Sequence, residues 1–144
     1  MKITKYPQSC LKLEHNNRAL LFDLGTLATA AYSLNDLGDF DAVLFTHRHP
    51  DHFDVRILPE LLGRGITCYG NADVGQAAGN LAIEVIEDGE ELVIADFKIK
   101  TCHLEHCLMV GGSSGVPNTG YLINDSVLIP GDSVVDPGFT CNVL

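Results

Sequence analysis

One nine-residue stretch, residues 46–54 (THRHPDHFD), constrains the structure that this chain can adopt more than any other part of the sequence. It follows the apolar run AVLF at residues 42–45, which is typical of a buried strand. In an extended segment, residues i and i+2 point to the same side. His47 and His49 are therefore predicted to present two ring nitrogens to one side of the chain.

The proline inside this stretch adds a second constraint. Pro50 favours extended geometry at His49, which preserves the pairing with His47, and it favours a turn directly afterwards. Such a turn brings Asp51 and His52 back toward the same place. Neutral imidazoles and carboxylates at a strand end form a ligand set suited to zinc, iron or manganese. The alternative is a surface loop that happens to be rich in histidine, and four ligand-type residues at fixed offsets disfavour it.

The pattern H-x-H-x-D-H after an apolar strand resembles the metallo-β-lactamase fold superfamily. In small cytosolic members of that family, a metal-binding histidine is followed by a loop, Asn-x-Gly-Tyr, a hairpin and Pro-Gly-Asp. Here His106, NTGY at residues 118–121 and PGD at residues 130–132 stand in the same order. The resemblance implies an α+β fold, namely an αββα sandwich of two mixed β-sheets with outer helices, formed by residues 1–144 as a single domain.

The resemblance also implies a ligand set. One metal would be held by His47, His49 and His106. The second would be held by Asp51, His52 and Asp132, with Asp132 bridging the two. From the residues alone, either His103 or His106 fits the third position, since both lie at the end of an apolar strand. Their separation of three predicts that they point to different sides, and the order of the family motifs favours His106.

Asp23, at the end of the strand predicted over residues 19–22, has two interpretations. The resemblance implies a carboxylate near the metal site. The alternative is an ordinary turn residue at a strand end.

Two features depart from the family. The second metal normally receives a further histidine from the C-terminal half of the domain, but no histidine follows His106 in this sequence. The chain also corresponds to about the first two-thirds of a family domain. We therefore expect a sandwich truncated at its C-terminus, and a homodimer or another partner that covers the missing half. The second site would be empty, weak, or completed by water, a partner subunit or a separately encoded segment.

Composition narrows the class of protein. A length of 144 residues with 46% hydrophobic and 19% charged residues is ordinary for one globular domain. The five cysteines are scattered and odd in number, which favours reduced thiols and a cytoplasmic location. No run reads as a signal peptide or a membrane span. The net charge of −10 repels a phosphate backbone, so we expect no nucleic-acid partner and no membrane partner.

Hydrophobic periodicity and turn residues predict the remaining elements. Helices are expected at residues 58–62 and 72–78, the second capped by Asn71 and closed by Gly79. Residues 26–38 are expected to form a loop with a short helical turn. Hairpin turns are predicted at residues 15–18, 87–90 and 124–125. Strands are predicted at residues 1–6, 9–14, 19–22, 41–45, 66–69, 81–86, 92–95, 97–102, 119–123 and 126–129.

These inferences lead to a functional hypothesis. The chain is expected to be a metal-dependent hydrolase in which metal-bound hydroxide attacks a small ester, lactone, amide or phosphoester. Asp51 would orient the nucleophile and accept its proton. The cofactor would be one or two divalent ions, with zinc first and manganese or iron as alternatives. The competing hypothesis is a catalytically weak or inactive metal-binding subunit or interaction module. A nuclease and a di-iron oxidoreductase are weaker alternatives.

Overall fold

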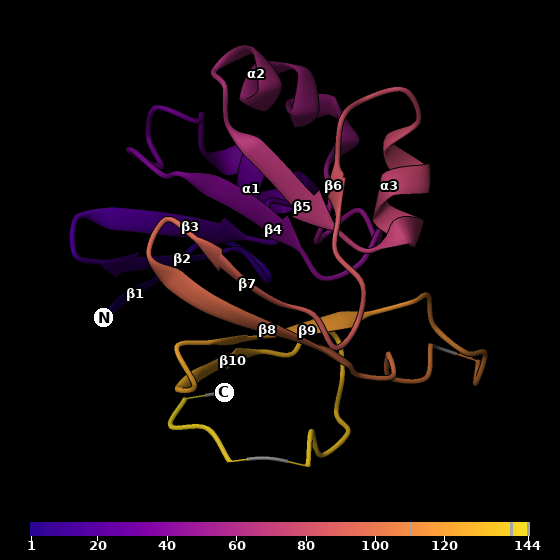
Figure 1. Ribbon diagram of the computed structural model, residues 1–144. Helices are drawn as coiled ribbons and strands as arrows, with labels where there is room; N and C mark the ends of the chain where they lie inside the picture. The colour runs from indigo at the N-terminus through magenta and orange to yellow at the C-terminus, as the bar shows by residue number, and fades with distance from the viewer. Residues whose placement is uncertain (110, 139, 144) are drawn as a thin grey trace.

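Two β-sheets pack face to face, and the helices lie against the outer side of the first sheet (Figure 1). The computed structural model describes residues 1–109, 111–138 and 140–143. The first sheet has the order β1 (Lys2–Lys5), β2 (Leu11–His15), β3 (Arg18–Phe22), β4 (Ala42–Phe45), β5 (Thr67–Gly70) and β6 (Glu84–Val85). The second has the order β10 (Val127–Ile129), β9 (Thr119–Ile123), β8 (Phe97–His103) and β7 (Glu91–Ile94). The helices are α1 (Thr26–Ala31), the 3₁₀ helix η1 (Val55–Ile57), α2 (Leu58–Gly63) and α3 (Ala72–Ala78).

The expected sandwich architecture is confirmed, with one difference in detail. The first sheet is mixed, because β1 to β3 are antiparallel and β3 to β6 are parallel. The second sheet is antiparallel throughout rather than mixed. Beneath it, the C-terminal segment runs beside β10, where the Leu128 amide donates to the Val143 carbonyl over 2.9 Å.

The central strands of the first sheet are buried on both faces. Leu20 and Phe22 of β3 point into the core between the two sheets, while Leu21 between them points to the helices. In β4, Leu44 faces the second sheet and Val43 faces the helices. Strands buried on both sides read as continuous apolar runs, which explains the sequence of residues 42–45.

Several predicted turns and caps are confirmed. Asn16 and Asn17 have φ of 50° and 63°, and Asn124 and Asp125 both have 51°, as tight hairpin turns require. In α3, the Asn71 side chain accepts from the Val74 amide over 3.0 Å, as an N-cap should.

Other boundaries were wrong. The strand predicted over residues 81–86 shortens to the two residues of β6. Residues 87–90 do not form a hairpin, because they carry the chain from the first sheet to the second. The strand predicted to begin at Ser9 begins at Leu11, because the chain first turns at Gln8, whose φ is 58°. The short helical turn expected within residues 26–38, by contrast, is present as the six-residue helix α1.

Among the described residues, no helix combines the length and the apolar character that spanning a bilayer requires.

Candidate metal centre

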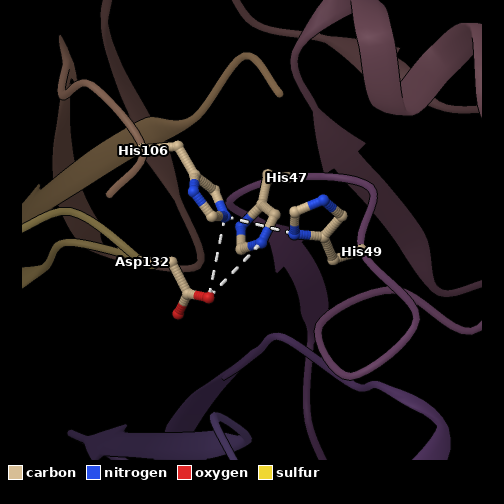
Figure 2. Close-up of side chains that lie close together, drawn as sticks. All are labelled: His47, His49, His106 and Asp132. Carbon is tan, nitrogen blue, oxygen red and sulfur yellow. Dashed lines mark hydrogen bonds and ion pairs between the residues drawn. The ribbon is translucent and has the colours of Figure 1, made fainter. Parts of the chain in front are cut away.

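Three imidazoles face one another where the two sheets meet (Figure 2). His47 and His49 follow β4 of the first sheet, and His106 follows β8 of the second. The ring centroids of the three histidines lie 4.8 Å apart in every pairing, and the rings are close to perpendicular. His106 Nε2 and His49 Nδ1 are 3.1 Å apart. The Asp132 carboxylate, which follows β10, lies beside them, with Oδ2 at 3.7 Å from His106 Nε2 and 3.9 Å from His47 Nε2.

A second group of potential ligands shares Asp132. Asp51, His52 and Asp132 each offer one atom to this group. His52 Nε2 lies 3.0 Å from Asp132 Oδ1 and 3.8 Å from Asp51 Oδ2. Asp132 therefore directs one carboxylate oxygen toward each group, as a bridging ligand would.

The turn after Pro50 brings His52 back toward His47. The amides of His52 and Phe53 both donate to the His49 carbonyl, over 2.9 and 2.8 Å. The rings of His47 and His52 consequently lie with centroids 4.0 Å apart. The backbone of Gly25 packs directly against this turn. Only glycine fits there, because a Cβ at that position would lie 2.0 Å from the Asp51 carbonyl oxygen.

Hydrogen bonds fix the ring orientation of His47 and His52 through one buried carboxylate, Asp23. Thr46 Oγ1 donates to Asp23 Oδ2 over 2.9 Å, so it accepts the proton of His47 Nδ1, which lies 3.0 Å away. His52 Nδ1 donates directly to Asp23 Oδ2 over 2.8 Å. In both rings Nε2 is left to face the cluster. Carboxylates and hydroxyls that hold the far nitrogen of a histidine are a common feature of metal sites.

His106 is held in a similar way. Its Nδ1 donates to the Cys107 carbonyl over 2.7 Å, which leaves the lone pair on Nε2, the nitrogen that faces His49. Gly115 packs against the other side of the ring, where a Cβ would lie 2.3 Å from His106 Cγ.

Asn118 joins the two strand ends of the second sheet. Its Nδ2 donates to the carbonyls of Leu104 and Pro130, both over 2.9 Å. Its Oδ1 accepts from the Asp132 amide over 3.3 Å. Gly131 has φ of 61°, and a Cβ there would lie 2.1 Å from Asn118 Oδ1. The NTGY and PGD motifs thus place the backbone that carries His106 and Asp132.

The surroundings of His47 and His49 favour their neutral form, in which one ring nitrogen keeps a free lone pair. Burial, reinforced by the neighbouring imidazoles of His52, His49 and His106, lowers the pKa of His47 to about 2. Burial and the His106 ring also lower the pKa of His49. Burial alone would lower the pKa of His52, but its hydrogen bond to Asp23 and the nearby carboxylates raise it overall. Metal ligation by histidine requires the neutral ring, so His47 and His49 are well prepared.

The residues present fit a cation by two criteria. His47 is fully buried, and its Nε2 has no hydrogen-bond partner among the described residues. Leaving such a group unsatisfied costs about 1–3 kcal/mol, so it calls for a ligand. Donors placed about 2.1 Å from one ion at tetrahedral or octahedral angles lie about 3.0–3.4 Å apart. The separations of 3.1 to 3.9 Å around His106 and Asp132 are close to that range.

Comparison with known proteins agrees with this picture. The sequence model of the Beta-lactamase superfamily domain matches residues 2–137. The chain belongs to the beta-lactamase superfamily. The resemblance seen in the H-x-H-x-D-H pattern is therefore confirmed.

Three similar proteins show how much of a longer sequence this chain matches. Protein Rv0786c of Mycobacterium tuberculosis is 32% identical over 151 residues, covering 100% of this chain and 69% of the relative. A Ribonuclease Z of Methanopyrus kandleri is 33% identical over 143 residues, covering 90% of this chain and 47% of the relative. A crystal structure from Parabacteroides distasonis, of a protein assigned as a metal-dependent hydrolase, superposes with a TM-score of 0.73 at 20% identity. That match covers 91% of this chain and 60% of the other. The chain thus spans between 47% and 69% of the length of these three proteins.

The structure distinguishes between His103 and His106, the two histidines that the sequence left as alternatives for the third ligand position. His106 lies in the cluster, whereas His103 is exposed and pairs with Asp88 Oδ2 over 3.1 Å. His15 lies on β2 beside Phe97, with ring centroids 6.2 Å apart. Of the two interpretations of Asp23, the structure favours the carboxylate beside the site.

Sequence reasoning missed three polar residues that contact this cluster. Thr46 connects Asp23 to His47, as described above. Ser9 Oγ lies 2.9 Å from His52 Nε2, and Gln8 Nε2 donates to Asp51 Oδ2 over 3.1 Å. Ser9 and His52 are 43 positions apart, and no local pattern marks such a contact.

Proposed function

We propose that this protein is a metal-dependent hydrolase of a small ester, lactone, amide or phosphoester. One divalent cation would be held by His47, His49, His106 and Asp132. A second would be held by Asp51, His52 and Asp132. The observation that carries the proposal is the position of Asp132, whose two oxygens face the two donor groups separately.

A bound divalent cation would lower the pKa of a water molecule toward 7 and polarise a substrate oxygen. The chain's own residues supply the rest. Asp51 is partly exposed, and its Oδ2 lies 3.8 Å from His52 Nε2 and is held by Gln8, so it is placed to orient a water and accept its proton. Asp23 and Thr46 keep the histidine rings in one orientation during this exchange.

The donor types favour zinc in the first group, because three imidazoles and one carboxylate are typical of zinc sites. Iron and manganese accept the same donors, and we propose them as alternatives.

Charge favours a small substrate over a nucleic acid. The net charge is −10, and the two arginines beside the histidine-rich turn are already paired. Arg48 contacts Asp73 over 2.7 Å, and Arg56 contacts Asp54 over 2.8 Å. Since the Methanopyrus relative is named Ribonuclease Z, RNA phosphodiesters belong among the substrates to be tested.

We also propose that a second copy or another partner covers apolar residues beside the site, in the reducing cytoplasm. Val134 and Leu108 flank Asp132 and His106 in sequence and are 86% and 73% exposed. A non-catalytic metal-binding module is the second candidate function. The observation that favours it is that the donors follow strands of both sheets, so that a cation held there could serve to join the sheets.

Metal analysis combined with a substrate panel tests the proposal. The purified protein should carry close to two divalent ions per chain and hydrolyse at least one ester, lactone or phosphoester. The Asp132→Ala variant should lose this activity, and the His103→Ala variant should keep it. Two bound ions without turnover on the panel would favour the binding module. No bound ion in the folded protein would refute both.

A further inference from the structure

The N-terminal turn at residues 6–10 reaches the second donor group of the metal centre. Its backbone is closed by the Tyr6 amide, which donates to the Cys10 carbonyl over 2.9 Å. Cys10 is fully buried in the core beneath the helices, which anchors the turn. Gln8 adopts φ of 58°, a region that residues other than glycine enter rarely. Such backbone strain is often found at functional sites.

This turn directs two side chains at the second group. Ser9 Oγ lies 2.9 Å from His52 Nε2. Gln8 Nε2 donates to Asp51 Oδ2 over 3.1 Å. Three oxygens therefore surround His52 Nε2, because Asp132 Oδ1 lies at 3.0 Å and Asp51 Oδ2 at 3.8 Å.

These separations match those of ligands on one ion. Two donors about 2.1 Å from a cation at octahedral or tetrahedral angles lie about 3.0–3.4 Å apart. The distances from His52 Nε2 to Ser9 Oγ and to Asp132 Oδ1 fall close to this range. A serine hydroxyl is also an established ligand for hard divalent cations.

We propose that Ser9 supplies the fourth protein ligand of the second cation, and that Gln8 positions Asp51 for the same ion. This inference rests on the proposed two-cation site. The resulting group has three oxygens and one nitrogen, whereas the first group has three nitrogens and one oxygen. Carboxylate and hydroxyl oxygens suit manganese and magnesium better than imidazole-rich sets do. The two positions therefore differ in metal preference, and Mn²⁺ competes with Zn²⁺ better at the second position than at the first.

A metal titration tests the stoichiometry. Protein stripped with a chelator is loaded with one equivalent of Zn²⁺ and then titrated with Mn²⁺, whose free form is followed by electron paramagnetic resonance. Wild type should bind one Mn²⁺. The Ser9→Ala variant should bind it at least about 10- to 100-fold more weakly, because the loss of even an outer partner of a metal ligand typically has that effect. Ser9→Thr should restore binding because it keeps the hydroxyl. Ser33→Ala, which removes an exposed turn hydroxyl that bonds to Asp36, is the matched control and should match wild type.

A second variant separates ligation from mere support of His52. In Ser9→Cys, a thiolate replaces the hydroxyl, and Co²⁺ bound at this position should produce a sulfur-to-cobalt charge-transfer band. Wild type has five cysteines of its own and serves as the baseline, and Ser33→Cys controls for an added thiol. The band in Ser9→Cys alone would support the proposal.

The outcomes distinguish a failure of the two-cation proposal from a failure of the role assigned to Ser9. If wild type binds no second cation, the proposed two-cation function fails together with this inference. If wild type binds two cations and Ser9→Ala binds the second equally well, only the role of Ser9 is refuted. Folding of each metal-free variant is checked by circular dichroism, so that a loss of binding is not confused with a loss of structure.

Discussion

Asp23→Asn is the most informative single substitution outside the proposed ligand set. Asp23 is almost fully buried, and its carboxylate accepts three kinds of donor: the Thr46 amide at 2.8 Å, Thr46 Oγ1 at 2.9 Å and His52 Nδ1 at 2.8 Å. Asparagine has nearly the same shape and tolerates the φ of 49° at this position. The substitution therefore changes the hydrogen-bond chemistry while the backbone is preserved.

The expected loss of metal affinity follows from the number of hydrogen-bond acceptors that asparagine offers. An asparagine has one acceptor oxygen, so if Oδ1 keeps the Thr46 amide, its NH₂ faces His52 Nδ1. Two donors cannot bond, and the His52 proton must move to Nε2, which removes the lone pair that would bind a cation. Loss of a supporting partner typically weakens metal affinity 10- to 100-fold, or about 1.4–2.7 kcal/mol. We expect about 100-fold at the group containing His52. At His47, which is reached only through Thr46, we expect about tenfold.

Competition with a chromophoric chelator measures both affinities. Asp41→Asn is the matched control, because Asp41 accepts from the Ala19 amide over 2.8 Å and precedes β4, at the other end of the strand from the site. That variant should bind metal as wild type does. If Asp23→Asn remains folded and binds both cations with unchanged affinity, then the carboxylate does not orient these histidines and the reasoning is refuted.

Three further substitutions test the surrounding geometry. Gly131→Ala places a Cβ in a closed, positive-φ position and should cost more than about 2 kcal/mol in urea unfolding, whereas Gly138→Ala, which meets no neighbour, should cost about 1 kcal/mol. His106→Ala should abolish tight binding of the first cation in calorimetric titration, while His103→Ala leaves it unchanged. His47→Leu removes the unpaired Nε2 and should be at least as stable as wild type in chelator. Zinc at 100 times its dissociation constant should then stabilise only wild type, by about 2.7 kcal/mol in paired thermal melts.

Local chemistry predicted much of the fold. The Asn16–Asn17 turn and helix α3 with its Asn71 cap depend on residues a few positions apart, so the sequence was sufficient to place them. Residues 87–90 show where that reasoning stops. Their composition indicates a turn, but whether the following strand joins the same sheet depends on distant partners, and β7 pairs with β8 rather than β6.

The residues of the candidate site also divide into those that local sequence could predict and those that it could not. The cluster around His47 and His49 was predictable because the spacing and the proline act within one short segment. His106 and Asp132 were selected by their order among family motifs, and the structure brings both beside His47. Ser9 was not predictable, because a serine next to a strand has no distinctive pattern and its contact with His52 exists only after β2, β3 and β4 have assembled in the first sheet.

The candidate metal centre draws its donors from both sheets, which has a structural consequence. His47 and His49 belong to the turn after the first sheet, whereas His106 and Asp132 follow strands of the second. A cation held by both sets would cross-link the two layers of the sandwich at their shared edge. Without it, the same edge concentrates buried imidazoles and an unpaired nitrogen, which is an unfavourable arrangement. Asn118 and Gly131 hold the backbone near His106 and Asp132 in place with or without a cation. The donors are therefore arranged before a cation binds, and the binding free energy is available to join the sheets instead of ordering the site.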